Sequence, residues 1–234
     1  MFRKLTVSCA ALLAPIATLG GFALNVAPVS AAILVTNLVD GSNPLPIPGV
    51  QAWGGQLGDD FVTTAPLVIT SIAVFDSDGD GTSVPLTWQL FDVSTGLPVA
   101  QAVVPASGLR TPGTTIVDNY IFQSITPIFL AANTTYSVVA YGFDDANMNF
   151  NTNFDLANFD VVFNTLGLNA AGGRYSNPGS FLTLPSVDAG NSLSTNPYNF
   201  GAASFEYSGV PEPMSALVWS LIIGASIVAA KRVM

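Results

Sequence analysis

The chain has no histidine and only one cysteine, and these absences exclude several kinds of catalytic site. The cysteine, Cys9, lies in an apolar segment near the start of the 234 residues. Neither a His-based triad nor a His/Cys metal site can form, and the body of the chain has no thiol for a disulfide or a nucleophile. A glycosidase would need two facing carboxylates, but no spacing of the acids singles out a pair. We therefore predict that the protein is not an enzyme.

Charged residues are also scarce, and those of positive sign almost absent. Only 9% of the chain is charged, with a formal net charge of −9. Residues 32–210 contain two basic residues, Arg110 and Arg174, against fourteen acids, which gives a balance of −12. Because nucleic-acid binding depends on cations that displace phosphate counterions, we predict no nucleic-acid partner. A strongly acidic region is typical of a secreted domain that its charge keeps soluble.

Residues 1–31 have the features of a signal peptide. Arg3 and Lys4 precede a long apolar stretch, which ends in the small side chains that a signal peptidase recognises. We predict cleavage after Ala31, with cleavage after Ala32 as a near alternative. The stretch is also long enough for an uncleaved membrane helix, but prolines and glycines interrupt it.

The C-terminal segment predicts a membrane anchor. Residues 214–230 contain no charge and no proline, and as a helix they would extend about 25 Å, close to the thickness of a bilayer core. Lys231 and Arg232 follow at once and act as a stop-transfer signal, so residues 231–234 form a basic cytoplasmic tail. A plain C-terminal anchor and a buried core helix are the alternatives.

Residues 209–213 connect the preceding domain to this apolar run. They contain Pro211, Glu212 and Pro213, and the prolines favour an extended, accessible peptide. A Pro-Glu-Pro motif, a membrane helix and a basic tail, in this order at the end of a chain with a signal peptide, resemble the PEP-CTERM proteins of Gram-negative bacteria. In that class the three parts form the sorting signal for exosortase.

The resemblance implies a route and a role. Signal peptidase and exosortase would be the processing partners, and an inner-membrane-anchored intermediate would precede delivery to the cell surface or extracellular matrix. The class is associated with biofilm and exopolysaccharide, so exopolysaccharide is an expected partner. We predict a structural or adhesive protein. The alternative is a secreted carbohydrate-binding module that calcium supports.

Residues 32–208 predict an acidic, all-β domain, an antiparallel β-sandwich of jelly-roll-like type. The segment Leu67–Phe75 is apolar on both faces, as a central strand would be, and Val84–Leu90 alternates between apolar and polar residues. Prolines and glycines separate such runs, and no amphipathic helix is evident. The remaining predicted strands are Val99–Val104, Asn119–Ile125, Thr134–Phe143, Ile33–Leu38, Phe159–Phe163 and Ala203–Tyr207.

One loop of this domain resembles the opening of a calcium-binding loop. Asp76, Asp78 and Asp80 alternate along the chain and Gly81 follows, as in the D-x-D-x-D-G pattern. The acid expected at the twelfth position is absent, since Thr87 stands there. Calcium is thus the one cofactor that the sequence suggests, and a polar turn without metal is the alternative.

A second segment, residues 144–160, is dense in asparagine, aspartate and phenylalanine. Amides and aromatic faces together are typical of sugar-binding sites, so a glycan-binding loop is one interpretation. In the other, Phe150, Phe154 and Phe159 pack onto the core while the asparagines make local turns.

Overall fold

The computed structural model describes residues 31–41, 43–152, 158–179, 183–187 and 199–210. Over these residues the chain is all-β, and its strands form antiparallel sheets, as the sequence predicts. Within the same ranges, no helix has the length and apolar character needed to cross a bilayer. The predicted membrane helix at 214–230 and residues 1–30 of the predicted signal peptide lie outside the described residues.

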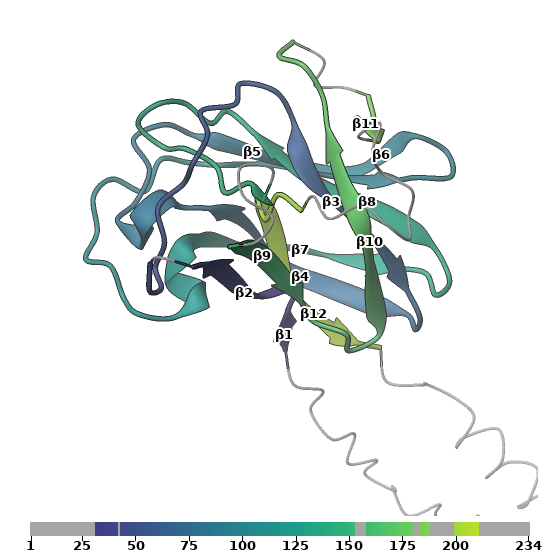
Figure 1. Cartoon of the computed structure of the whole chain (residues 1–234). Helices are drawn as coiled ribbons and strands as arrows, with labels where there is room; N and C mark the ends of the chain where they lie inside the picture. The colour runs from purple at the N-terminus through teal and green to yellow at the C-terminus, as the bar shows by residue number, and fades with distance from the viewer. Residues whose placement is uncertain (1–30, 42, 153–157, 180–182, 188–198, 211–234) are drawn as a thin grey trace, which may run out of the picture.

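Two larger sheets form two layers, and a small third sheet lies beside them (Figure 1). The four-stranded sheet has the order β1 (Ala32–Ile33), β12 (Ala203–Gly209), β4 (Leu67–Phe75), β7 (Tyr120–Leu130). The six-stranded sheet has the order β11 (Ser186–Val187), β10 (Leu168–Tyr175), β3 (Leu57–Thr63), β8 (Thr135–Tyr141), β5 (Leu86–Asp92), β6 (Leu97–Val104). The third sheet pairs β2 (Val35–Asp40) with β9 (Phe159–Phe163), and the short 3₁₀ helices are η1 (Ser77–Gly79) and η2 (Ile116–Asn119).

The strands with the clearest apolar patterns are confirmed. β4 has the predicted bounds and lies between β12 and β7, in the interior of its sheet. β5 begins at Leu86, two residues later than predicted, and Trp88 and Leu90 on its inner face are fully buried. β9 also has its predicted bounds. β7 continues past Ile125 through Pro127, which an edge strand tolerates because one side of its backbone needs no partner.

A single aromatic and aliphatic core joins the two layers. Phe61 of β3 and Phe205 of β12 come from opposite sheets, and their ring centroids lie 5.2 Å apart. Trp88 of β5 donates a hydrogen bond of 3.0 Å from Nε1 to the carbonyl oxygen of Ser204 in the other sheet. Burial of side chains of this size stabilises the fold by about 1.5–3 kcal/mol each, so this inter-sheet contact fixes the two layers face to face.

β3 and β10 are central to the larger sheet, although the sequence did not predict them. β3 alternates with period two: Phe61 faces the other sheet, and Asp60 faces the opposite side. On that outer side Arg174 of β10 donates from Nε to both carboxylate oxygens of Asp60, at 2.6 and 2.8 Å. Both side chains are buried, at 2% exposure for Asp60 and 8% for Arg174. A buried ion pair therefore replaces the apolar contact that a strand usually makes at this position.

The two ends of the described chain lie side by side. Ala32 and Ile33 of β1 pair with Tyr207 and Glu206 of β12, and β1 is an edge strand (Figure 1). The strand that opens the domain thus pairs with the strand that closes it.

Candidate functional site

The residues predicted for export and sorting lie mostly outside the described part of the chain. This applies to Pro211, Glu212 and Pro213, and to Lys231 and Arg232. Of the two predicted signal-peptidase positions, Ala31 is exposed and directly precedes β1, and Ala32 is the first residue of that strand.

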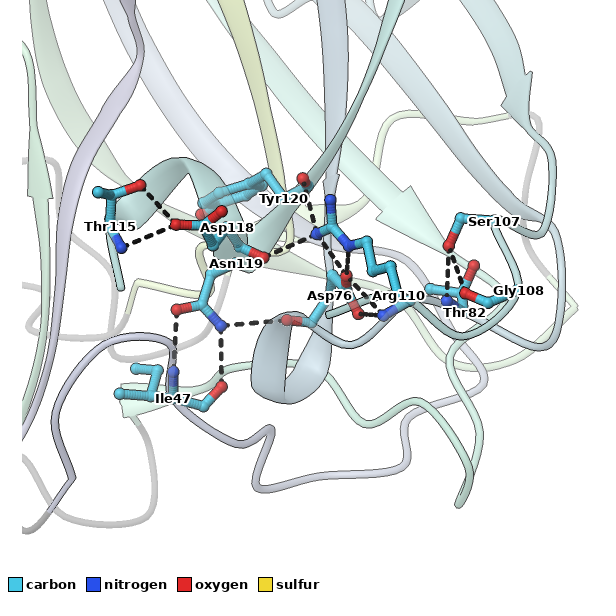
Figure 2. A network of polar contacts seen from close by, with 11 residues as sticks. Ile47, Asp76, Thr82, Ser107, Gly108, Arg110, Thr115, Asp118, Asn119 and Tyr120 are labelled. Carbon is cyan, nitrogen blue, oxygen red and sulfur yellow. Dashed lines mark hydrogen bonds and ion pairs between the residues drawn. The ribbon is translucent and has the colours of Figure 1, made fainter. Parts of the chain in front are cut away.

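The predicted calcium loop follows β4 and carries a completely buried carboxylate. Asp76 has 0% exposure, and both its oxygens accept from the backbone N–H of Gly81, at 3.1 and 3.0 Å. Its Oδ2 also accepts from Nε and Nη2 of Arg110, at 3.0 and 2.6 Å (Figure 2). Burial raises the pKa of Asp76, and the hydrogen bonds and charge of Arg110 act against that rise.

The same network joins two further segments, residues 118–120 and the segment around Ile47, at this end of the sandwich (Figure 2). Nη2 of Arg110 also donates to the carbonyl oxygens of Asp118 and Tyr120, at 2.7 and 3.2 Å. The buried side chain of Asn119 donates to the carbonyl oxygens of Ile47 and of Asp76, and it accepts from the N–H of Ile47. The side chains of Arg110 and Asn119 thus supply hydrogen-bond partners for backbone groups of loops that are far apart in sequence. The network holds the loops in place, and its polar atoms are occupied in doing so.

This geometry favours the polar-turn interpretation of the loop over the calcium interpretation. Asp76 is engaged by a cation of the chain itself, and Asp78 accepts a weak hydrogen bond from Ser77 at 3.3 Å. Asp78 has a φ of 60°, a left-handed conformation that aspartate adopts in turns. In the described ranges, no three acidic side chains are gathered closely enough to hold a metal ion. Calcium binding by Asp76, Asp78 and Asp80 stays a prediction that the geometry does not favour.

A second buried carboxylate holds the chain segment before β12. Asp59 of β3 accepts from the N–H groups of Phe200 and Gly201, each at 3.0 Å, and the hydroxyl of Tyr120 donates to the carbonyl oxygen of Gly201 at 2.7 Å. Burial raises the pKa of Asp59 to about 7, although the two N–H groups lower it and nearby Asp60 adds a smaller rise. This carboxyl has backbone donors but no cation, so it changes its protonation near neutral pH.

The segment 144–160 follows the core-packing interpretation where it is described. Phe150 is fully buried, and its ring lies 6.2 Å from that of Phe75 and 5.7 Å from that of Phe159. Asn147 and Asn149 are also buried, so neither amide is accessible to a sugar at the surface. Phe154 lies outside the described residues. The burial of Asn147 and Asn149 therefore argues against a glycan-binding site that uses these two amides.

Sequence analysis missed the role of the two arginines. Arg110 and Arg174 each pair with a buried aspartate far away in the sequence, Asp76 and Asp60 respectively. The available signal was their scarcity: when a domain has two cations and fourteen acids, the carboxylates that become buried compete for those cations. The sequence alone does not say which carboxylates these are.

We expect calcium to leave the stability of the protein unchanged, because Arg110 already neutralises Asp76. The melting temperature of the full chain should be the same in millimolar calcium and in EDTA. A melting temperature that rises in calcium, with a rise that Asp78→Asn abolishes and Asp92→Asn at the end of β5 does not, would instead establish the calcium site.

Stability should increase as the pH is lowered from about 7 to 5. With a pKa of about 7, Asp59 binds its proton more tightly in the folded than in the unfolded chain, so the free energy of unfolding falls as pH rises towards that value. The contribution of this group is at most about 1.4 kcal/mol per pH unit. Burial also raises the pKa values of Asp60 and Asp76, and the hydrogen bonds and charge of Arg174 and Arg110 act against that rise.

The test is urea unfolding across this pH range for the wild type and Asp59→Asn, whose pH dependence should be weaker. Asp92→Asn is the control: hydrogen bonds from Ser94 lower the pKa of Asp92, so its removal should leave the slope unchanged. Parallel slopes for the wild type and Asp59→Asn would show that Asp59 does not titrate in this range.

No family model matches the chain, and no curated protein matches its sequence. What the protein does is therefore inferred from its own residues and their geometry.

Proposed function

We propose that this chain is an exported protein with a structural or adhesive role at the bacterial cell surface or in the extracellular matrix. The observation that carries the proposal is the order of segments at the C-terminus. Pro211-Glu212-Pro213, the uncharged run 214–230 and the pair Lys231-Arg232 follow one another, in a chain that opens with the features of a signal peptide. In this proposal the protein is first anchored in the inner membrane, and exosortase then recognises its PEP-CTERM signal.

The pairing of the chain ends supports processing at both positions. The proposed cuts, after Ala31 and near 211–213, fall directly outside β1 and just beyond the end of β12 at Gly209. Neither cut removes a residue of any described strand, and β1 stays hydrogen-bonded to β12 after both. Processing would therefore release the domain without exposing its core.

The distribution of charge supports a role outside the cell in contact with polymer. Both arginines of residues 32–210 form ion pairs with buried aspartates, so they do not neutralise the acids at the surface. An acidic surface stays soluble and resists close contact with other anions. Exopolysaccharide is the partner that we propose; an anionic polymer would need divalent cations as bridges, and a neutral one would not.

The proposal is tested by the intact mass of the protein recovered from the cells that produce it. We expect a chain that begins near Ala32 and ends within 211–213. A chain that still carries residues 214–234 would contradict sorting and would indicate a resident membrane protein.

The chain offers a matched control for this experiment, because it contains only two glutamates, Glu206 and Glu212. Glu212→Gln should leave the C-terminal segment attached, whereas Glu206→Gln, on β12, should be processed like the wild type. Equal processing of both variants would show that the carboxylate of Glu212 is not recognised.

A further inference from the structure

The segments proposed for the membrane both continue from one end of the sandwich, which we call the tether end. Val210, where the described chain ends, donates from its N–H to the carbonyl oxygen of Pro66, in the connection between β3 and β4. Ala31 directly precedes β1, whose Ala32 pairs with Tyr207 of β12, two residues before the end of that strand. The sequence on either side of the domain is therefore attached at the same place.

Four connections between strands meet at the tether end, and these are residues 64–66, 93–96, 131–134 and 164–167. Backbone hydrogen bonds join them, from the N–H groups of Asn133, Val93 and Thr64 to the carbonyl oxygens of Thr63, Thr135 and Gly167 respectively. None of the four connections contains a charged residue. Asp92 borders one of them, and its Oδ1 accepts a hydrogen bond from Ser94. The tether end is thus a nearly uncharged part of an acidic domain.

Three large apolar side chains are exposed at the tether end, on three different segments. Leu97, directly after the connection 93–96, is 65% exposed. Phe129, which pairs with Val68 near the start of β4, is 61% exposed. Leu166, in the connection to β10, is 54% exposed. Single exposed apolar residues are common, but several at an uncharged end of a domain indicate a surface that contacts something apolar.

Acidic residues gather at the opposite end of the sandwich. β4 is nine residues long, which separates the two ends by about 26 Å, and Asp78 and Asp80 follow it. Asp118 and Asp144 lie on connections at the same end as these two. Leu109 is 90% exposed there, next to Arg110 in the sequence. Exposed apolar residues therefore occur at both ends, and the absence of acids from its connections distinguishes the tether end.

The chain between the domain and the proposed membrane span is short. Four peptide units connect Val210 to Met214, the first residue of the uncharged run 214–230, and they extend no more than about 14 Å. The headgroup region on each side of a bilayer core is roughly 6 Å thick. While the run spans the bilayer, as in the proposed function, Val210 therefore stays close to the lipid headgroups, and the tether end stays there with it.

We infer that the tether end lies on the bilayer in the anchored intermediate, and that Leu97, Phe129 and Leu166 contact the interfacial region of the lipids. Apolar side chains gain free energy when they enter this region, whereas charged groups lose it. Because residues 32–210 have a balance of −12, the uncharged end is the one that approaches lipid at the lowest cost. The contact requires the anchor of the proposed function, so the test measures the anchor separately.

The test places a fluorescent label at single positions of the full-length chain, in phosphatidylcholine vesicles. These vesicles contain lipids with a nitroxide quencher on the headgroup or, in separate samples, on the acyl chain. Cys9→Ser removes the only native thiol. Ala65→Cys, at an exposed position between β3 and β4, reports on the tether end, and Ala106→Cys, exposed beyond β6, reports on the opposite end. Ser220→Cys, within the uncharged C-terminal run, reports on insertion of the anchor.

We expect headgroup quenching at Ala65→Cys to exceed that at Ala106→Cys about fivefold, because only the tether end contacts the lipids. Equal quenching at both positions would overturn the contact, since the domain would then have no preferred orientation. Absence of quenching at Ala65→Cys, with acyl-chain quenching at Ser220→Cys, would overturn the lipid contact and leave the anchor intact. A protein partner would then be the alternative occupant of this surface. Absence of quenching at Ser220→Cys would overturn the anchor, and the contact with it.

Two triple variants distinguish contact with lipid from simple tethering. The first changes the exposed apolar residues of the tether end, Leu97→Ser/Phe129→Ser/Leu166→Ser. The control changes three exposed apolar residues away from that end, Val103→Ser/Leu109→Ser/Val117→Ser. The first variant should lower headgroup quenching at Ala65→Cys about threefold, because the short tether then holds the domain without apolar contact, and the control should not change it.

Unchanged quenching in the first variant, or an equal loss in both, would overturn the contact. Unchanged melting temperatures would verify that both variants fold. If a triple variant unfolds, the three single substitutions at the tether end give the same test, each with a smaller expected loss of quenching than the three together.

Discussion

The interaction on which the rest of the structure depends is the neutralisation of buried aspartates by the only two cations of the domain. Arg174 joins β10 to β3 through Asp60, and Arg110 joins the loops at one end of the sandwich through Asp76. A carboxylate removed from water is costly unless it is paired and hydrogen-bonded, and each arginine supplies both conditions. Asp59 has no such cation and depends on two backbone N–H groups and on a raised pKa.

These internal pairs also determine what the protein presents to its surroundings. With both arginines paired to buried carboxylates, no basic residue of the domain is left to neutralise its other acids. The strands that open and close the domain, β1 and β12, pair with each other, so the segments proposed for export and sorting leave from neighbouring points. The two ion pairs thus act as internal supports of the fold.

The all-β class and the apolar strands could be predicted from the sequence because a strand buried on both faces has apolar residues at both odd and even positions, as in β4. β3 and β10 could not. The sequences LGDDFVT of β3 and LNAAGGRY of β10 are typical of loops, because they contain adjacent acids or adjacent glycines. They form strands in which Arg174 binds Asp60 across the sheet, and this contact is not visible in either sequence. The geometry does not favour the calcium prediction, for the same reason. The spacing of the three aspartates shows only which groups are close in sequence, and it does not show that Arg110, 34 residues away, binds Asp76. Long-range polar pairing leaves no local pattern.

The most direct test of this account is a double-mutant cycle on the buried pair of Asp60 and Arg174, measured by the free energy of unfolding. Arg174→Met should destabilise the chain by about 3–5 kcal/mol, because it leaves Asp60 buried without a cation. Adding Asp60→Leu should recover part of that loss, since the uncompensated charge is then gone. A loss below about 1 kcal/mol for Arg174→Met, or additive losses in the double variant, would show that the pair behaves like a surface salt bridge and would contradict the account.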